Sequence, residues 1–281
     1  MNFQKITILL LLTTGSAVAQ IKGVVKDSLT RQPIPYVSIW VENETQGTTS
    51  EEDGSFYIHP KGDSKTLIFS TLGYEKVRRK GASTVKPMEI LLSPKSVALK
   101  EMVISKWKGT KHKEIGETDN GICQAFDNAP NIDLKYFPYL SEYKKTKFIK
   151  RVAIYTDCRI DNASIKLHFY SVGANGFPGE ELLQDDYIVT VKKGVGKSSF
   201  NISELGLKMP ENGIYVGFEK LMIEKNRTDI RFYPLVLYNY VTKDFVFVYS
   251  GGKWMKKVLR ENASEDPKRV YEPAINLTLT N

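Results

Sequence analysis

The sequence contains little of what metal and nucleophilic chemistry requires. It has two cysteines and three histidines, His59, His112 and His168, which lie far apart in the chain. Zinc sites draw on closely spaced Cys and His residues, so this spacing argues against a zinc centre. A catalytic nucleophile needs a neighbouring base and an orienting acid, and no Gly-x-Ser-x-Gly motif is present. We therefore predict no catalytic residue, and an undetected hydrolase is the last of three functional hypotheses.

Cofactor motifs are also lacking. The adjacent pairs Glu180-Glu181 and Asp185-Asp186 lie near a turn, where solvated charges are the ordinary interpretation. No Asp-x-Asp-x-Asp-Gly calcium loop occurs, so we predict no cofactor and leave a loop-bound calcium ion open. The two cysteines, Cys123 and Cys158, would close a loop of about 35 residues as a disulfide, which adds roughly 3–4 kcal/mol. Two buried free thiols are the alternative.

Long apolar runs are absent except at the amino end. Residues 6–12 are apolar, and Ala17-Val18-Ala19 supplies the small residues that a signal peptidase reads. The run is too short for a bilayer, which needs roughly 20 apolar residues. We predict a signal peptide over residues 1–19, cleaved after Ala19, and no transmembrane span in the mature chain.

Export limits what the positive charge means. The formal net charge is +8, which would permit nucleic-acid binding in the cytoplasm. In an exported protein the anionic counterparts are polymers of the cell envelope. We therefore expect no nucleic-acid partner.

Residues 20–104 show several short strands separated by turns. Residues 21–27 and 36–41 alternate as strands do, and Asp53-Gly54 marks a tight turn. The Gly-x-Val strand, the Pro-Ile-Pro-Tyr-Val step, the Gly-Thr-Thr-Ser turn and the Phe-Ser-x-Leu-Gly-Tyr-Glu strand resemble the carboxypeptidase regulatory-like domain. That resemblance implies a small transthyretin- or Ig-like β-sandwich, which we expect to be antiparallel, and no catalysis.

This version of the domain resembles those at the amino ends of TonB-dependent receptors of Bacteroidetes. Residues 97–104 are similar to the stretch that precedes the plug in such receptors. Only 177 residues follow Ile104 (281 − 104), too few for a plug and a large barrel. The resemblance therefore implies a place in the cell envelope but no transport activity.

Residues 105–119 are charged and predict an exposed linker. Residues 120–281 show eight or nine strand patterns and no helical periodicity, which predicts an all-β, jelly-roll-like sandwich. The segments at 235–240 and 245–249 are expected to form a hairpin. His168 lies opposite the apolar Ile165, Leu167 and Phe169, so we expect it to face solvent. This half resembles accessory sandwiches of secreted Bacteroidetes proteins only weakly.

Exposed aromatic rings are the main candidates for ligand binding. Trp254 follows a Gly-Gly break, and Tyr136 and Tyr139 lie in a Pro-containing segment. Flat rings of this kind cover the apolar face of a sugar, although packing in the core or at its rim is the ordinary alternative.

We interpret the chain as a non-catalytic exported protein of the periplasm or outer membrane, with the cell surface and secretion left open. It would be an adapter or binding module for an outer-membrane or periplasmic protein of an uptake system. The alternative is a carbohydrate-binding protein that recognises envelope or host glycans through its second sandwich.

Overall fold

The computed structural model describes residues 20–62, 65–81, 87–96, 109–116, 122–126, 130–229, 231–258 and 269–281, with the side chains of 122–126 left aside. The predicted signal peptide lies outside these residues, as do the segment similar to the pre-plug stretch and the two ends of the predicted linker, residues 105–108 and 117–119. Within the described part of the chain all regular structure is β, apart from three 3-10 turns, η1 (Ser141–Lys145), η2 (Ser203–Leu205) and η3 (Glu224–Asn226). The predicted all-β class is confirmed.

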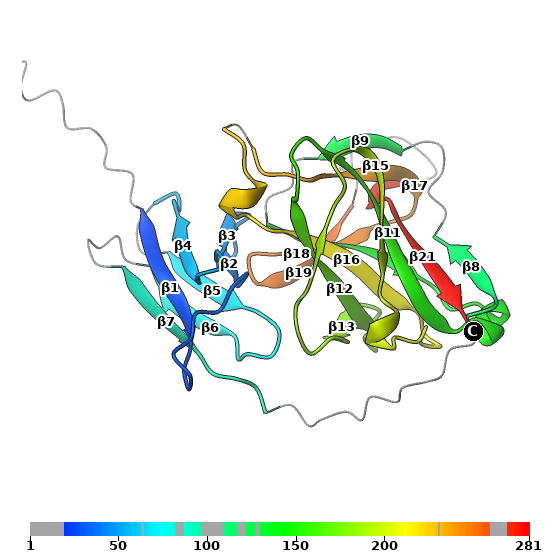
Figure 1. Cartoon of the computed structure of the whole chain (residues 1–281), viewed down its shortest axis with the longest axis horizontal. Coiled ribbons are helices and arrows are strands. Elements are labelled where there is room, and N and C mark those ends of the chain that lie inside the picture. Colours follow the sequence, from blue (N-terminus) through cyan, green and yellow to red (C-terminus); the bar gives the residue numbers. More distant parts are fainter. Residues whose placement is uncertain are drawn as a thin grey trace, which may run out of the picture.

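The first sandwich occupies the amino-terminal part of the described chain (Figure 1). One sheet has the order β3-β2-β5-β6 and the other has the order β4-β1-β7. The strands are β1 (Ile21–Asp27), β2 (Ser38–Val41), β3 (Gly47–Thr49), β4 (Ser55–Ile58), β5 (Thr66–Ser70), β6 (Val77–Lys80) and β7 (Met88–Leu92). Alternation in β1 buries Ile21, Val25 and their neighbours between the two sheets, where they meet Phe69 and Leu92.

One pairing in this sandwich differs from the expected antiparallel arrangement. Strand β7 pairs with β1 in parallel, with Val25 opposite Ile90. A parallel neighbour requires a crossover rather than a hairpin, and the chain provides one by passing through the other sheet between β4 and β7. The short strands predicted from local alternation carry no information about this direction.

The second sandwich begins with a sheet that we call the docking sheet, because the first sandwich lies on it. Its order is β13-β12-β16-β10-β18-β19, and β14 also pairs with β12. Its strands are β10 (Ile132–Phe137), β12 (Ser164–Val172), β13 (Pro178–Glu181), β14 (Tyr187–Thr190), β16 (Ile214–Lys220), β18 (Val246–Ser250) and β19 (Lys253–Lys257). Strand β16 is buried along its whole length, because both of its faces are covered.

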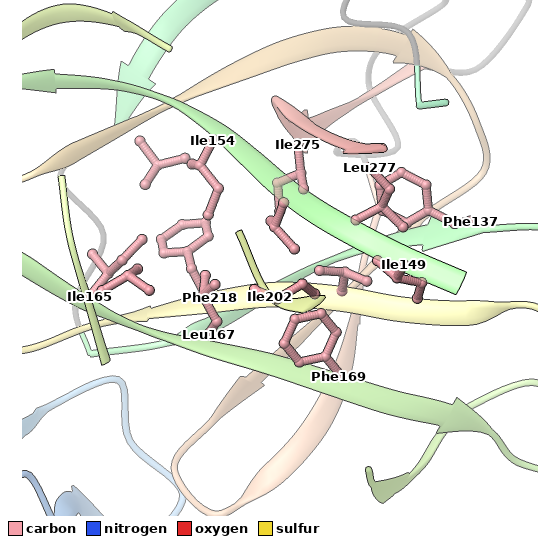
Figure 2. Close-up of a cluster of buried hydrophobic side chains, with 14 of the residues drawn as sticks. Phe137, Ile149, Ile154, Ile165, Leu167, Phe169, Ile202, Phe218, Ile275 and Leu277 are labelled. Carbon is pink, nitrogen blue, oxygen red and sulfur yellow. The ribbon is translucent and has the colours of Figure 1, made fainter. Parts of the chain in front are cut away.

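The opposite sheet of the second sandwich has the order β20-β17-β11-β21-β8, with β15 paired to β11 and β9 to β17. Its strands are β8 (His112–Ile115), β9 (Ile122–Phe126), β11 (Phe148–Cys158), β15 (Gly194–Asn201), β17 (Leu235–Thr242), β20 (Arg269–Pro273) and β21 (Ile275–Thr280). Figure 2 shows apolar side chains of both sheets meeting in the core, among them Ile154 of β11, Leu167 of β12 and Phe218 of β16.

The predicted hairpin at residues 235–249 is wrong. Strand β17 pairs with β9, β11 and β20, whereas β18 pairs with β10 and β19 in the docking sheet. The short connection between β17 and β18 therefore crosses from one sheet to the other. The true hairpin joins β18 to β19 through Gly251 and Gly252, and it lies between the two sandwiches (Figure 1).

Part of the predicted linker is structured. Residues 112–115 form β8, which pairs with β21 at the edge of the opposite sheet. The backbone N–H of Gly109 also donates to the carbonyl of Asn281, at 3.0 Å. The second sandwich therefore begins earlier in the sequence than residue 120.

The β18–β19 turn packs closely against the first sandwich. The backbone N–H of Asn43 donates to the carbonyl of Gly251 at 2.9 Å, and Lys253 Nζ donates to Asn43 Oδ1 at 3.1 Å. A Cβ at Gly251 would lie 2.6 Å from the carbonyl oxygen of Glu44. This close backbone approach requires glycine at position 251.

Replacing Gly251 by Ala should therefore loosen the interface. Both Gly251 (φ +58) and Gly176 (φ +76) are in the left-handed region, but a Cβ at Gly176 would meet no atom within 4 Å. Gly176→Ala thus measures the cost of the left-handed backbone alone, about 1–2 kcal/mol. We expect Gly251→Ala to lower the unfolding free energy by about 1–3 kcal/mol more, as overpacking does, in chemical denaturation. An equal decrease in unfolding free energy in the two variants would contradict the close packing of the β18–β19 turn against the first sandwich.

Candidate functional site

The outer face of the docking sheet carries polar side chains that are nevertheless buried. In β12, Ile165, Leu167 and Phe169 point into the core, so Lys166 and His168 point the other way. His168 is only 5% exposed. The expectation that it faces solvent is wrong, because the first sandwich covers this face of the sheet.

Lys166 ties the two sandwiches together. It lies in β12 and is 1% exposed. Its Nζ lies 2.7 Å from Asp186 Oδ2 and 3.9 Å from Glu219 Oε2. It also donates to the backbone carbonyl of Tyr36 in the first sandwich, at 2.9 Å. Burial alone would lower the pKa of Lys166, but the charges of Asp186 and Glu219 outweigh burial and raise it, so the ammonium stays charged.

His168 lies between two carboxylates. Its Nδ1 is 2.9 Å from Glu181 Oε2 and its Nε2 is 3.2 Å from Glu219 Oε2. Both nitrogens donate when the ring is protonated. Burial opposes the charged form, but hydrogen bonds to Glu181 and Glu219, together with their charges, raise the pKa of His168 to about 9. The imidazolium is therefore the resident form at neutral pH.

Asp186 connects this group to the first sandwich a second time. Thr71 Oγ1 donates to its Oδ2 at 2.5 Å, and the backbone N–H of Leu72 approaches its Oδ1 at 3.4 Å. Burial would raise the pKa of Asp186, but the charge and hydrogen bond of Lys166 lower it overall. Lys166, His168, Glu181, Asp186 and Glu219 form what we call the interdomain charge cluster.

The interdomain charge cluster is closed to substrates. Its side chains range from 1% exposed for Lys166 and Glu219 to 16% for Asp186. A general acid or base must lie within hydrogen-bond reach of the proton that it transfers. Within the described residues these groups are paired with one another, except for Glu219 Oε1, which is buried without a hydrogen-bond partner. The cluster therefore serves best as an anchor between the sandwiches.

An aromatic cluster continues the interface beyond the charges. Trp40 and Ile68 of the first sandwich pack with Ile132, Leu134, Tyr215, Phe247 and Tyr249 of the docking sheet. Trp40 Nε1 donates to the carbonyl of Pro130 at 2.6 Å, and its ring contacts Tyr249 edge to face, with centroids 5.2 Å apart. Burying apolar surface stabilises association by roughly 25 cal/mol per Å², so this cluster supplies attraction that the charges do not.

The loop around η3 forms a further contact between the sandwiches. Met222 donates its N–H to Thr49 Oγ1 at 3.0 Å, and Glu224 donates its N–H to Glu51 Oε1 at 2.9 Å. Tyr57 is hydrogen-bonded to the carboxylate of Glu224. The contacts therefore reach both β3 and β4 of the first sandwich.

The structure separates the three aromatic residues that were predicted to bind ligand. Trp254 and Tyr136 are half-buried and both pack on the interdomain aromatic cluster. Trp254 meets Tyr170 and Tyr249 edge to face, each with centroids 5.0 Å apart. Tyr139 packs instead on the core of the second sandwich. Ligand binding by these residues stays a prediction.

Cys158 is buried in the core of the second sandwich, and its thiol lies 3.3 Å from the carbonyl oxygen of Ile160. Burial raises the pKa of this thiol, which lowers its reactivity. The side chain of Cys123 lies outside the described residues, so the disulfide stays a prediction.

Residues 21–104 match the sequence model of the CarboxypepD_reg-like domain family. The predicted identity of the first sandwich is therefore confirmed, and this domain type is non-catalytic. No curated protein matches the chain.

Within the described parts of the chain, no three His, Cys, Asp or Glu residues are grouped as a metal ion would require. The same residues include no helix long and apolar enough to cross a membrane. The predicted calcium alternative and the predicted location of the protein stay untested.

Proposed function

We propose that the chain is a non-catalytic, exported cell-envelope protein that binds a partner of an outer-membrane or uptake system. The match of residues 21–104 to a CarboxypepD_reg-like domain carries the proposal. The burial of the interdomain charge cluster supports it, since the most reactive side chains of the docking sheet hold the two domains together.

The docked arrangement decides which surface a partner would use. The sheet containing β2 and β5 faces the second sandwich through Trp40 and Ile68. In the other sheet, β4-β1-β7, Tyr57 of β4 is the residue described as hydrogen-bonded to the second sandwich, through Glu224 and Arg227. The β1 side of the first domain, which includes the turn at Leu29, is therefore the proposed adapter surface.

A photo-crosslinking amino acid placed at Leu29 tests this adapter role in the native cells. Leu29 is 78% exposed in the first sandwich, and Val195 is 74% exposed in the second, so the two positions form a matched pair. We expect a defined outer-membrane or periplasmic protein to be captured from Leu29 at least fivefold more than from Val195. Capture of no envelope protein from Leu29 would count against the proposal.

A carbohydrate-binding role is the second candidate, because Trp254 belongs to a group of half-buried aromatic rings. Tyr170 contacts it edge to face, and Phe177 and Phe245 pack on the same cluster. Saturable binding to a glycan array that Trp254→Ala weakens tenfold or more, and that Trp254→Phe largely retains, would support it. Thermal unfolding of both variants is the control, because Trp254 also packs on Tyr249.

A further inference from the structure

The end of the second sandwich that lies away from the first sandwich is strongly basic. Figure 1 shows strand β8 and the carboxyl end of β21 at this end. Residues 110–114, 140–151 and 206–211 come together there, and in the sequence they contain eight lysine or arginine residues and three acids. Seven of these basic residues form what we call the basic end: Lys111, Lys144, Lys145, Lys147, Lys150, Arg151 and Lys208.

Strand pairing and ring contacts hold the three segments together. Phe148, at the start of β11, pairs with Thr280 of β21 and forms a bridge to Lys208. Thr280 in turn pairs with His112 of β8. The Nζ atoms of Lys147 and Lys208 lie 5.7 and 5.6 Å from the centroid of the Phe148 ring, within the range of a cation–π contact. Two ammonium groups from separate segments are therefore held over one aromatic ring.

A β-bulge in β11 turns two consecutive basic side chains away from the core. Ile149 and Arg151 pair with neighbouring residues of β21, so Lys150 between them is the extra residue of the bulge. Ile149 and Val152 both enter the core, whereas Lys150 is half-buried and Arg151 is exposed. Regular alternation would send one of two consecutive side chains into the core. The bulge therefore increases the positive charge on the outer face of this sheet.

Two of the three acids in these segments are paired with lysines outside the basic end. Glu142 Oε1 lies 2.7 Å from Lys113 Nζ, and Glu114 Oε1 lies 2.6 Å from Lys197 Nζ. The third acid is Glu211. The basic end therefore keeps a large excess of positive charge.

The surroundings of Lys150 add to this excess. Its Nζ lies 3.4 Å from Nε2 of His112, another basic residue. An anion that approaches Lys150 also meets His112, and protonation of His112 adds one further charge. Residues 105–108, which precede this end of the molecule in the sequence and lie outside its described part, contain two lysines and no acid.

The side chains at the basic end are of the kinds that contact lipid headgroups. All seven are exposed except Lys150, which is half-buried. Six of them are lysines, which attract anions as flexible point charges, whereas arginine is favoured where a phosphate is held in a fixed bidentate geometry. Leu140, at the beginning of η1, is 44% exposed. Basic and apolar side chains are found together in segments that bind at a membrane interface.

We propose that the basic end binds an anionic lipid surface, with its lysines near the headgroup phosphates and Leu140 at the boundary with the acyl chains. Attraction between clustered basic residues and an anionic leaflet acts across an exposed surface and requires no pocket. A soluble anionic polysaccharide carries similar charge but gives Leu140 no apolar partner. The proposal goes beyond the proposed function, because the adapter surface lies in the first sandwich and stays accessible to a protein partner.

Co-sedimentation of the mature chain, residues 20–281, with lipid vesicles tests the proposal. The vesicles consist of phosphatidylcholine alone or of an equimolar mixture of phosphatidylcholine and phosphatidylglycerol. We expect binding to the mixed vesicles to be at least tenfold tighter than to phosphatidylcholine. It should weaken as the salt concentration rises, because salt screens exposed charges.

Two triple variants with the same change in net charge locate the binding surface. Lys147→Glu, Lys150→Glu and Lys208→Glu together should weaken binding to the mixed vesicles at least tenfold, since each basic residue near such a surface contributes about fivefold in affinity. The control combines Lys22→Glu, Lys192→Glu and Lys225→Glu, three exposed lysines elsewhere on the molecule. It should bind within about threefold of the wild type.

A second basic-end variant guards against misfolding, because Lys147 and Lys208 also pack on Phe148. It combines Lys111→Glu, Lys144→Glu and Lys145→Glu, and thermal unfolding of every variant checks that it is folded. We expect this variant to lose affinity for the mixed vesicles as the first one does.

Several results would overturn the proposal. They are equal binding to the two kinds of vesicle, no binding to either, and equal loss of affinity in the control and basic-end variants. Binding to alginate, a soluble anionic polysaccharide, without binding to vesicles would also overturn it and would identify a polymer as the partner. None of these results changes what is captured from Leu29, so this proposal and the adapter role can fail separately.

Discussion

Replacing Lys166 by Met will lower the unfolding free energy by about 3–5 kcal/mol, the range found when one partner of a buried ion pair is removed. Methionine is similar in length to lysine but leaves Asp186 buried without its ion-pair partner and Glu219 with His168 alone. It also removes the hydrogen bond to the carbonyl of Tyr36. The loss should appear in chemical denaturation followed by tryptophan fluorescence, because Trp40 lies in the same interface.

An exposed lysine provides the matched control for this substitution. Lys193 lies 2.8 Å from Asp161, with side chains 54% and 71% exposed. Surface pairs contribute about 0–1 kcal/mol, so Lys193→Met should change stability by less than 1 kcal/mol. Combining Lys166→Met with Asp186→Leu should recover part of the loss, because the uncompensated carboxylate is then gone. Similar effects for Lys166→Met and Lys193→Met would refute the anchoring role.

The stability of the protein will fall as the pH rises from about 6.5 to about 9. The pKa of His168 is about 9 in the folded protein against 6.5 for a free side chain. A raised pKa means that the folded state binds the proton more tightly, so the stabilisation is complete below pH 6.5. It is lost as the pH passes through the folded value. The shift corresponds to roughly 3 kcal/mol at most.

Lys166 and Tyr170, two titratable neighbours of His168, do not reproduce this profile. Glu181 and Glu219 flank the ring, Lys166 has a raised pKa, and the pKa of Tyr170 lies well above its ordinary value. His168→Gln should therefore be less stable than the wild type at pH 6 and lose most of the slope between pH 6.5 and 9. The comparison requires unfolding free energies of both proteins at several pH values. An unchanged slope in His168→Gln would contradict the assignment.

The local strands and the first domain were predictable because their signals lie within short stretches. Alternation in residues 21–27 and the turn at Asp53-Gly54 are local features, and the family match confirms the domain that they define. The pairing of β17 with β11 and of β18 with β10 depends on contacts distant in sequence. Two neighbouring strand patterns with a short connection look the same whether they pair or diverge into two sheets.

The buried charges were not predictable from alternation alone. Lys166 and His168 alternate with apolar residues, as polar side chains on a solvent-facing strand do. A strand face that another domain covers shows the same two-residue alternation, so the sequence pattern does not distinguish the two cases. One signal was available in β16, where Tyr215 shares its face with Glu219. Apolar residues on both faces of a strand indicate a strand buried on both sides, and β16 pairs directly with β12.

The hydrogen bonds that the carbonyl of Tyr36 and the hydroxyl of Thr71 make to the second sandwich limit which domains can replace the first one. A purely apolar docking face would accept any partner with a matching apolar surface. Lys166 and Asp186 favour a domain that presents a carbonyl and a hydroxyl at those two places, since a partner lacking them removes one hydrogen bond from each buried charge. The two halves of this chain are thus matched to each other, and exchanging the first for another member of its family would require both contacts to be carried along.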